Sequence, residues 1–265
     1  TVTVPSSDGG YFSPVNTLAL IQGTASEQPV HAFARVGEVQ IRIKRIDNSG
    51  DGPCWTGSSW TQTNNDCSGT WVSSSGWNAA SVNWSLVKPN SCAGDWCDNY
   101  RYDINVRARD LTVPTSNLAE PTTRFFTYDS TIPTLDFIKP NNSLYQDQTS
   151  FPGNITGTAS DASNDRASKV TAVEVAIRNP ANGPDGWWNG SNFSSITDAN
   201  CQDTTVGNCW AASTLTQDAD PSNAPWDVYW NFISTPTWTT GQTYRVKIRV
   251  RDAAGGTSIF AMQRE

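Results

Sequence analysis

The sequence predicts an all-β protein of two tandem antiparallel β-sandwich domains with long loops rich in Trp and Cys. Three observations support this fold class. Apolar and polar residues alternate in several segments, no segment has a convincing helical period, and a set of motifs occurs twice in the same order. The 265 residues are enough for two domains of ordinary size. The 19 Gly and 15 Pro suit the many turns of such a fold.

Motifs of the first half of the chain recur in the second half. IQGTASE, beginning at Ile21, returns as ITGTASD, beginning at Ile155, about 134 residues later. The other matched segments follow in the same order: EVQIRIKR with EVAIRN, WTGSSW with WNGSNF, WNAAS from Trp77 with WAAS from Trp210, NWSL around Trp84 with YWNF around Trp230, and YDINVRARD with YRVKIRVRD. We therefore expect two homologous domains, 1–131 and 132–265, joined near 129–133.

Alternation with a period of two identifies the central strands. Val39, Ile41 and Ile43 alternate with Gln40, Arg42 and Lys44, and the segment 244–251 alternates in the same way. One apolar and one polar face are typical of an antiparallel sheet packed on one side. The basic residues of the later segment could bind an anionic polymer, but a solvated strand face is the simpler interpretation; these residues are Arg245, Lys247, Arg249 and Arg251.

Taken together, these motifs resemble the bacterial immunoglobulin-like repeats. A first strand that ends in Pro, then GTASD, an alternating strand that ends in Arg, WxGxxW, and YxVxxRxxDxxG are similar to that family. Such repeats occur in tandem in large secreted, surface and adhesin-type proteins. The resemblance implies immunoglobulin-like sandwiches with a spacer or scaffold role. The cysteine loops and the insertion at 214–228 depart from the pattern.

Six Cys residues occur as three pairs that are close in sequence. None has the CxxC spacing of a zinc site. We expect local disulfides formed in an oxidising, extracellular or cell-surface compartment; reduced structural thiols are the alternative. The expected pairs are Cys54–Cys67, Cys92–Cys97 and Cys201–Cys209.

The 12 Trp residues have two interpretations. Trp residues at matched positions, such as Trp84 and Trp230, favour packing beneath long loops. Those without a match could instead stack on sugar rings or lie in a protein interface. The unmatched Trp residues are Trp71, Trp96, Trp226 and Trp238.

Several classes of function have little support in the sequence. The net charge of −7 argues against nucleic-acid binding, and no apolar run is long enough to insert into a membrane. His31, the single His, has no supporting catalytic motif, so we expect no enzyme, no cofactor and no metal site. The acidic runs at 161–165 and 218–223 could hold calcium, but neither has the spacing of a known calcium loop, and turn chemistry is the default explanation.

The two ends of the chain suggest how copies could associate. The first five residues resemble the segment that opens the second domain, and the last residues resemble the end of the first domain. The chain lacks an initiator Met and an export signal, as expected of a mature product or a segment of a longer array.

We therefore expect a non-enzymatic subunit of an extracellular filament or surface stalk that assembles head to tail with copies of itself. For the N-terminal segment, the alternative is that it forms the first strand of its own domain. For the function, the alternative is a carbohydrate-binding or adhesive module that uses exposed Trp. The expected assembly residues are Thr1, Val2, Thr3, Val4, Ile259 and Phe260.

Overall fold

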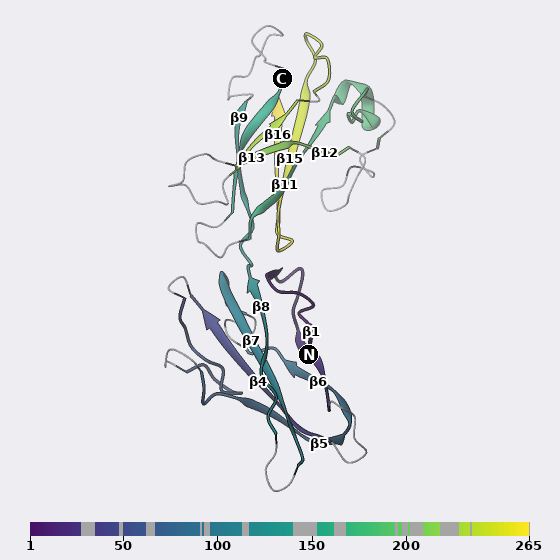
Figure 1. Ribbon diagram of the computed structural model, residues 1–265. Helices are drawn as coiled ribbons and strands as arrows, with labels where there is room; N and C mark the ends of the chain where they lie inside the picture. The colour runs from purple at the N-terminus through teal and green to yellow at the C-terminus, as the bar shows by residue number, and fades with distance from the viewer. Residues whose placement is uncertain are drawn as a thin grey trace. The chain divides into compact units, whose positions relative to one another are not determined.

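Figure 1 shows the computed structural model of residues 1–265, in which the chain forms two compact units, Thr1–Ser130 and Thr131–Glu265. The structure describes residues 1–27, 35–47, 50–61, 67–90, 92, 96–112, 117–139, 153–161, 168–193, 196–197, 201, 209–217, 228–233 and 235–264, with the backbone alone described at 74–78, 184–185, 217 and 260–264. The fold is all-β, with several sheets arranged as open sandwiches. A single 3₁₀ segment, Pro180–Asp185, interrupts the strands of the described part.

The first unit contains a three-stranded and a five-stranded sheet. The smaller sheet has the order β1-β3-β6 and the larger sheet the order β2-β8-β7-β4-β5. Most neighbours are antiparallel, whereas β2 pairs with β8 in parallel. The strands are β1 (Val2–Val4), β2 (Gly10–Phe12), β3 (Leu20–Ser26), β4 (Val36–Ile46), β5 (Val72–Ala79), β6 (Ser81–Val87), β7 (Tyr100–Asp110) and β8 (Thr122–Tyr128).

The second unit contains two four-stranded antiparallel sheets with the orders β13-β14-β10-β9 and β12-β11-β15-β16. Its strands are β9 (Thr134–Lys139), β10 (Ile155–Ser160), β11 (Val170–Arg178), β12 (Ala211–Ala212), β13 (Thr214–Gln217), β14 (Val228–Phe232), β15 (Tyr244–Asp252) and β16 (Thr257–Arg264).

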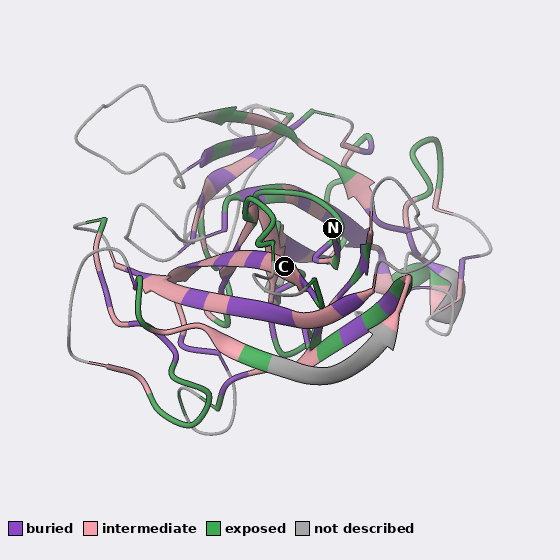
Figure 2. Ribbon diagram, turned by 60° about the horizontal axis from the view of Figure 1, so that its bottom comes forward, coloured by how far each residue is buried: buried purple, intermediate pink, exposed green. Residues whose placement is uncertain are grey.

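The cores follow the alternation in the sequence, and Figure 2 shows buried positions alternating with partly exposed ones along the strands. Val39, Ile41 and Ile43 are at most 1% exposed in the first core. Val246 and Ile248 hold the same kind of position in the second. Side chains of successive strand residues point to opposite faces, so this pattern places one face of each sheet in a core.

A glycine faces a tryptophan in both units. Gly23 pairs with Trp84 across β3 and β6, and Gly157 pairs with Trp230 across β10 and β14. Trp84 is 2% exposed and Trp230 1%, as their matched positions predict. A Cβ atom on either glycine would overlap the indole ring and a backbone carbonyl of the adjacent edge strand. Glycine is required here by space rather than by backbone conformation.

The N-terminal strand belongs to its own unit, as in the simpler of the two interpretations of this segment. β1 pairs with β3, and Val2 is 5% exposed within the first core. The terminal ammonium of Thr1 donates to the carbonyl of Thr24 at 2.7 Å, and the Thr24 amide donates back at 3.0 Å. The residues expected to insert into another copy therefore already form an edge strand here.

Candidate functional site: an arginine and tryptophan cluster on the first unit

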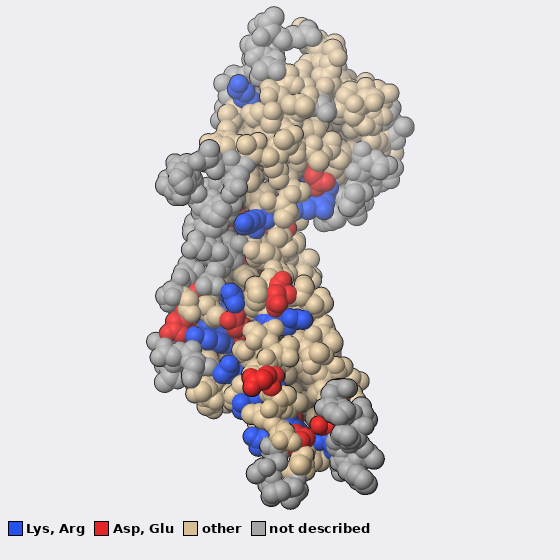
Figure 3. Space-filling view, viewed as in Figure 1, with Lys and Arg blue, Asp and Glu red and all other residues tan. Residues whose placement is uncertain are grey.

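Five charged or polar side chains and one Trp gather on the outer face of the five-stranded sheet. β4 and β7 lie side by side at the middle of that sheet, with Glu38 opposite Arg109 and Gln40 opposite Arg107. The neighbouring outer-face position on β4 is Arg42. In the view of Figure 3, basic and acidic side chains are interspersed over the first unit. We call the set Glu38, Gln40, Arg42, Trp71, Arg107 and Arg109 the arginine cluster.

Trp71 holds two guanidinium groups. The guanidinium carbon of Arg107 lies 3.8 Å from the centre of its ring, and that of Arg42 lies 4.7 Å from it. Both distances are well inside the range in which a cation is attracted to an aromatic face. Trp71 is only partly exposed, immediately before β5. Its ring therefore positions two arginines rather than standing open as a platform for sugars.

Hydrogen bonds fix the polar members of the cluster. Arg107 donates from Nε to Oε1 of Gln40 at 2.7 Å, and Gln40 donates from Nε2 to Oε2 of Glu38 at 3.0 Å. Ser73 Oγ donates to the other oxygen of Glu38, and Arg109 Nε lies 3.8 Å from this carboxylate. These hydrogen bonds hold Arg107, Gln40 and Glu38 in one orientation.

The charges of this cluster do not balance. The hydrogen bond from Ser73, followed by that from Gln40 and the charges of Arg109 and Arg107, lowers the pKa of Glu38, although desolvation opposes this. The pKa of Arg107 is lowered, first by desolvation and then by repulsion from Arg109 and Arg42. The cluster thus contains three guanidiniums and one carboxylate, and the pKa of that carboxylate is lowered.

The second unit has the same arrangement in a closed form. Arg249 Nε donates to Glu174 at 2.7 Å, and the guanidinium of Arg249 lies 4.3 Å from the ring centre of Trp210. Arg251 approaches the same carboxylate at 3.3 Å. A small apolar cluster covers this region, and Arg249 is 0% exposed. The expectation of a solvated basic face is therefore wrong at Arg249, because a loop buries it against a charged partner.

Strand register identifies the counterpart of Trp210. Ile41 and Gln40 pair with Val72 and Ser73, whereas Val175 and Glu174 pair with Ala211 and Ala212. The residue that precedes the first of these partners is Trp71 in one unit and Trp210 in the other. Trp71 is therefore matched, and the alignment of Trp77 with Trp210 is wrong. The same register corrects the match of EVQIRIKR with EVAIRN by two residues, because Gln40 and not Glu38 corresponds to Glu174. A sequence signal was available, since both Trp residues begin the pattern W-x-x-S.

Trp96 and Trp238 are also a matched pair. Each lies six residues before a Tyr at or near the start of β7 or β15. The Trp ring packs edge-on against that Tyr, with ring centres 4.6 Å apart for Trp96 and Tyr102 and 4.7 Å apart for Trp238 and Tyr244. Trp96 is 2% exposed, and its Nε1 donates to the carbonyl of Leu18 at 2.9 Å. Trp96 therefore serves the core, and its buried ring offers no open face to a sugar.

The two tyrosines close the same turn in each unit. Tyr102 Oη accepts from the backbone amide of Cys97 at 2.8 Å, and Tyr244 Oη accepts from that of Thr239 at 3.0 Å. In both cases the donor lies five residues upstream. A tyrosine bonded back to the loop before its own strand is a feature of immunoglobulin-type sandwiches.

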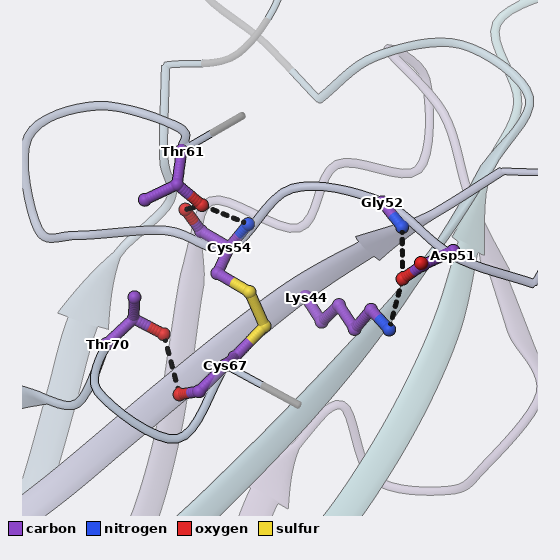
Figure 4. The surroundings of a disulfide bond; sticks show 7 residues. All are labelled: Lys44, Asp51, Gly52, Cys54, Thr61, Cys67 and Thr70. Carbon is purple, nitrogen blue, oxygen red and sulfur yellow. Dashed lines mark hydrogen bonds and ion pairs between the residues drawn. A yellow bond between two sulfur atoms is a disulfide. The ribbon is translucent and has the colours of Figure 1, made fainter. Parts of the chain in front are cut away.

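Disulfides hold the long loops. The structure joins Cys54 with Cys67, Cys92 with Cys97, and Cys201 with Cys209, with Cα atoms 5.7, 5.0 and 5.6 Å apart, the same pairs that sequence proximity predicts. Figure 4 shows the first of these bridges. There, Thr61 exchanges hydrogen bonds with the backbone of Cys54, and Thr70 donates to the carbonyl of Cys67 at 2.9 Å. Cys67 lies four residues before Trp71 and so anchors the loop that leads to the arginine cluster.

Other candidate residues lie outside the described part of the chain. These are Trp226, His31 and most of both acidic runs. Asp161, which is described, is buried and accepts a hydrogen bond from Ser168 Oγ at 2.9 Å. Among the described residues, no group of three or more His, Cys, Asp or Glu is arranged to hold a metal ion. The described helical segment is far too short to cross a membrane.

Comparisons with known proteins give little beyond this geometry. No family model matches the chain, and no curated protein sequence matches it. Among solved structures, one similar chain is a Ca²⁺-stabilised adhesin that helps an Antarctic bacterium bind ice, at 12% identity and a TM-score of 0.27. The match covers 99% of the present chain and 46% of the adhesin, so this chain spans less than half of the adhesin's length.

Proposed function

We propose that this chain is a pair of immunoglobulin-like modules, 1–131 and 132–265, with a structural, non-enzymatic role in an extracellular stalk or filament. One observation carries the proposal: both units build the same framework from the same residue types. Gly23 with Trp84 corresponds to Gly157 with Trp230, and the tyrosine turn at Tyr102 to that at Tyr244. The repetition of these framework contacts in both units supports a tandem array of similar modules.

The strand orders support an immunoglobulin-like assignment. In the first unit, β1, β3 and β6 form one sheet, and β8, β7, β4 and β5 form most of the other. This division resembles that of immunoglobulin sandwiches in which an additional strand extends the larger sheet. The tyrosine turns add a second feature of that class.

Three disulfides support an extracellular or cell-surface location. Such bonds persist in oxidising compartments and are rare in reducing ones. Each bridge lies within one unit and stabilises a loop of that unit. This suits a module that must remain folded outside the cell.

Head-to-tail assembly is the finer part of the proposal. Because β1 pairs with β3 of its own unit, we propose that copies associate through edge strands and not through an inserted N-terminal segment. β1 and β16 are the outermost strands of their sheets, and Ile259 on β16 is 38% exposed. Pairing between the edges of two copies would extend a sheet by backbone hydrogen bonds. A contact of this kind that does not close on itself builds an open filament.

Electron microscopy of negatively stained protein at rising concentration tests this assembly. We expect end-to-end chains of the two-unit protein. Thr3→Lys and Ile259→Lys should each shorten them, because charge on an edge strand opposes pairing. Tyr229→Phe, on an exposed residue away from both edges, is the control. Chains that persist in both Lys variants would contradict edge pairing, and particles that stay single at every concentration would contradict assembly itself.

The alternative function, sugar binding by exposed Trp, has weaker support. Trp96 is buried, Trp238 packs on Tyr244, and Trp71 contacts two arginines. None of these three presents a bare aromatic platform.

A further inference from the structure

The two units provide an internal comparison of one site in two electrostatic states. Arg107 and Arg249 occupy the same place, each beside a Trp and each bonded through Nε at 2.7 Å. The acceptor is the neutral Gln40 in the first unit and the carboxylate of Glu174 in the second. In the second unit a carboxylate thus opposes the buried Arg249 directly, although Arg251 shares that carboxylate. In the first unit the direct partner of Arg107 is neutral and leaves its charge in place.

We propose that the arginine cluster of the first unit is a binding surface for an acidic polysaccharide. Trp71 orients Arg42 and Arg107 toward the ligand, and Gln40 fixes Arg107 without cancelling its charge. This inference goes beyond the proposed structural role, since a stalk module needs no ligand.

The donors required for such a ligand are present. A guanidinium carries five N–H groups and binds a carboxylate or sulfate through two of them at once. Among the described contacts, Arg107 uses only Nε in a hydrogen bond, and Arg42 makes a ring contact alone. The side chain of Arg109 is 43% exposed. Three guanidiniums side by side on neighbouring strands suit repeated negative charges along one chain.

The place of the cluster favours a polysaccharide over an acidic peptide. Peptides that bind to sheets usually add a strand at an edge, where backbone groups are open. β4 and β7 lie in the interior of their sheet, so each already has a strand on both sides. Recognition here must come from side chains alone. A polymer whose charges lie on its sugar rings meets that condition.

Charge complementarity is local, since the whole protein carries a net charge of −7. The net charge of the protein therefore repels a polyanion. Binding would therefore depend on the arginine cluster and would weaken with added salt. Glu38 is the one carboxylate of the cluster, and the carboxylate of Asp103, on the same face of β7, is paired with Arg101 at 2.6 Å.

The test measures binding of the whole oxidised protein to oligogalacturonate, which carries carboxylates, and to dextran sulfate, which carries sulfates. Two variants each lower the net charge of the cluster by one. Arg42→Gln removes a positive charge, and Gln40→Glu adds a negative charge and so copies the acceptor of the second unit. Each should weaken binding about tenfold, the value expected for one charge-assisted contact. Melting curves establish that both variants are folded.

Two matched controls separate the cluster from general charge. Arg124→Gln makes the same change in net charge elsewhere on this sheet, where Arg124 faces Asp8 at 3.4 Å, and it should leave the affinity unchanged. Glu174→Gln reverses the swap in the second unit and should create no new site, because Arg249 is 0% exposed.

The outcomes are decisive in each arm. Binding of either acidic polymer supports the proposal if only the cluster variants lose affinity. The polymer that binds more tightly identifies the anionic group, carboxylate or sulfate. Equal losses in Arg124→Gln and Arg42→Gln would overturn it, as would binding of neither polymer. Methyl-esterified oligogalacturonate that bound equally well would also contradict charge recognition. Equally tight binding of poly-glutamate would contradict the choice of a polysaccharide.

Discussion

Trp84 packs so closely against Gly23 on the neighbouring strand that a side chain at position 23 would force the ring or the N-terminal strand to move. A Cβ atom there would overlap both the indole ring and the carbonyl oxygen of Thr1. Gly157 and Trp230 stand in the same relation, with Asp136 in place of Thr1. The pair thus couples the first strand of each unit to its core.

Gly23→Ala should lower the free energy of unfolding by roughly 1–3 kcal/mol, because the overlap must be relieved by movement of a buried ring or an edge strand. Urea denaturation followed by Trp fluorescence measures this. Gly69→Ala is the control, since a Cβ atom at Gly69 would meet nothing within 4 Å. Equal midpoints for the two variants would refute the packing constraint.

Trp84→Ala should cost about 3–5 kcal/mol, the usual loss for truncating a buried Trp. Trp230→Ala should cost a similar amount in the second unit, as Trp230 is 1% exposed. Calorimetry of the whole chain gives both values. A Trp84→Ala protein that kept its melting temperature would show that the side chain is not part of the core.

Tyr102→Phe and Tyr244→Phe should each cost roughly 1–2 kcal/mol. The backbone amides of Cys97 and Thr239 would lose their acceptor. Thermal melting of the oxidised protein measures the loss. Tyr229→Phe, which changes a residue that is 46% exposed, should melt like the unmodified protein. A similar shift in all three variants would indicate that the turn bond contributes nothing specific.

Asp110 makes the free energy of unfolding of the first unit depend on pH in the acidic range. Its carboxylate accepts bonds from the amide and hydroxyl of Thr112 and from the amide and side chain of Asn117. The Thr112 hydroxyl bond, followed by those from Asn117 and the Thr112 amide, lowers its pKa from 3.8 to about 2, against a smaller opposing effect of desolvation.

A carboxyl whose pKa is lower in the folded state stabilises the fold at pH values above its unfolded pKa. This contribution should be complete near pH 5 and should disappear as the pH falls from about 4 to about 2. Asp110→Asn should lose roughly 2 kcal/mol at pH 5. Denaturation midpoints of both proteins between pH 5 and pH 2 should converge at the acid end; a constant difference would contradict this account.

Cys201→Ser with Cys209→Ser should destabilise the second unit by about 2–3 kcal/mol, the typical effect of a short-loop bridge. It should also loosen the cover over Arg249, because both sulfurs pack in the apolar cluster with Trp187 and Trp210. Hydrogen exchange of β11 and β12, compared with that of the paired Cys92→Ser and Cys97→Ser variant, measures this. Unchanged protection beside Trp210 would argue against a role for the bridge in closing that site.

The sequence alone determined the features that depend on neighbours along the chain. Alternation of Val39, Ile41 and Ile43 with polar residues predicted strands and their buried face, because side chains in a strand point to opposite sides in turn. Close spacing predicted the cysteine pairs, since a short loop keeps two Cys within bonding distance. Matched positions predicted the buried Trp84 and Trp230.

Only the tertiary structure decided which loop residues pack on the outer faces of the sheets. The loops that precede Trp71 and Trp210 differ in sequence and length, so only strand register shows that these two residues correspond. The burial of Arg249 likewise depends on a loop that folds over the outer face of its sheet, and alternation along β15 carries no information about that cover. Gln40 and Glu174 come opposite their arginines through pairing between strands that are about 70 residues apart in the chain. Contacts between residues so far apart depend on register and on packing, which local patterns do not encode.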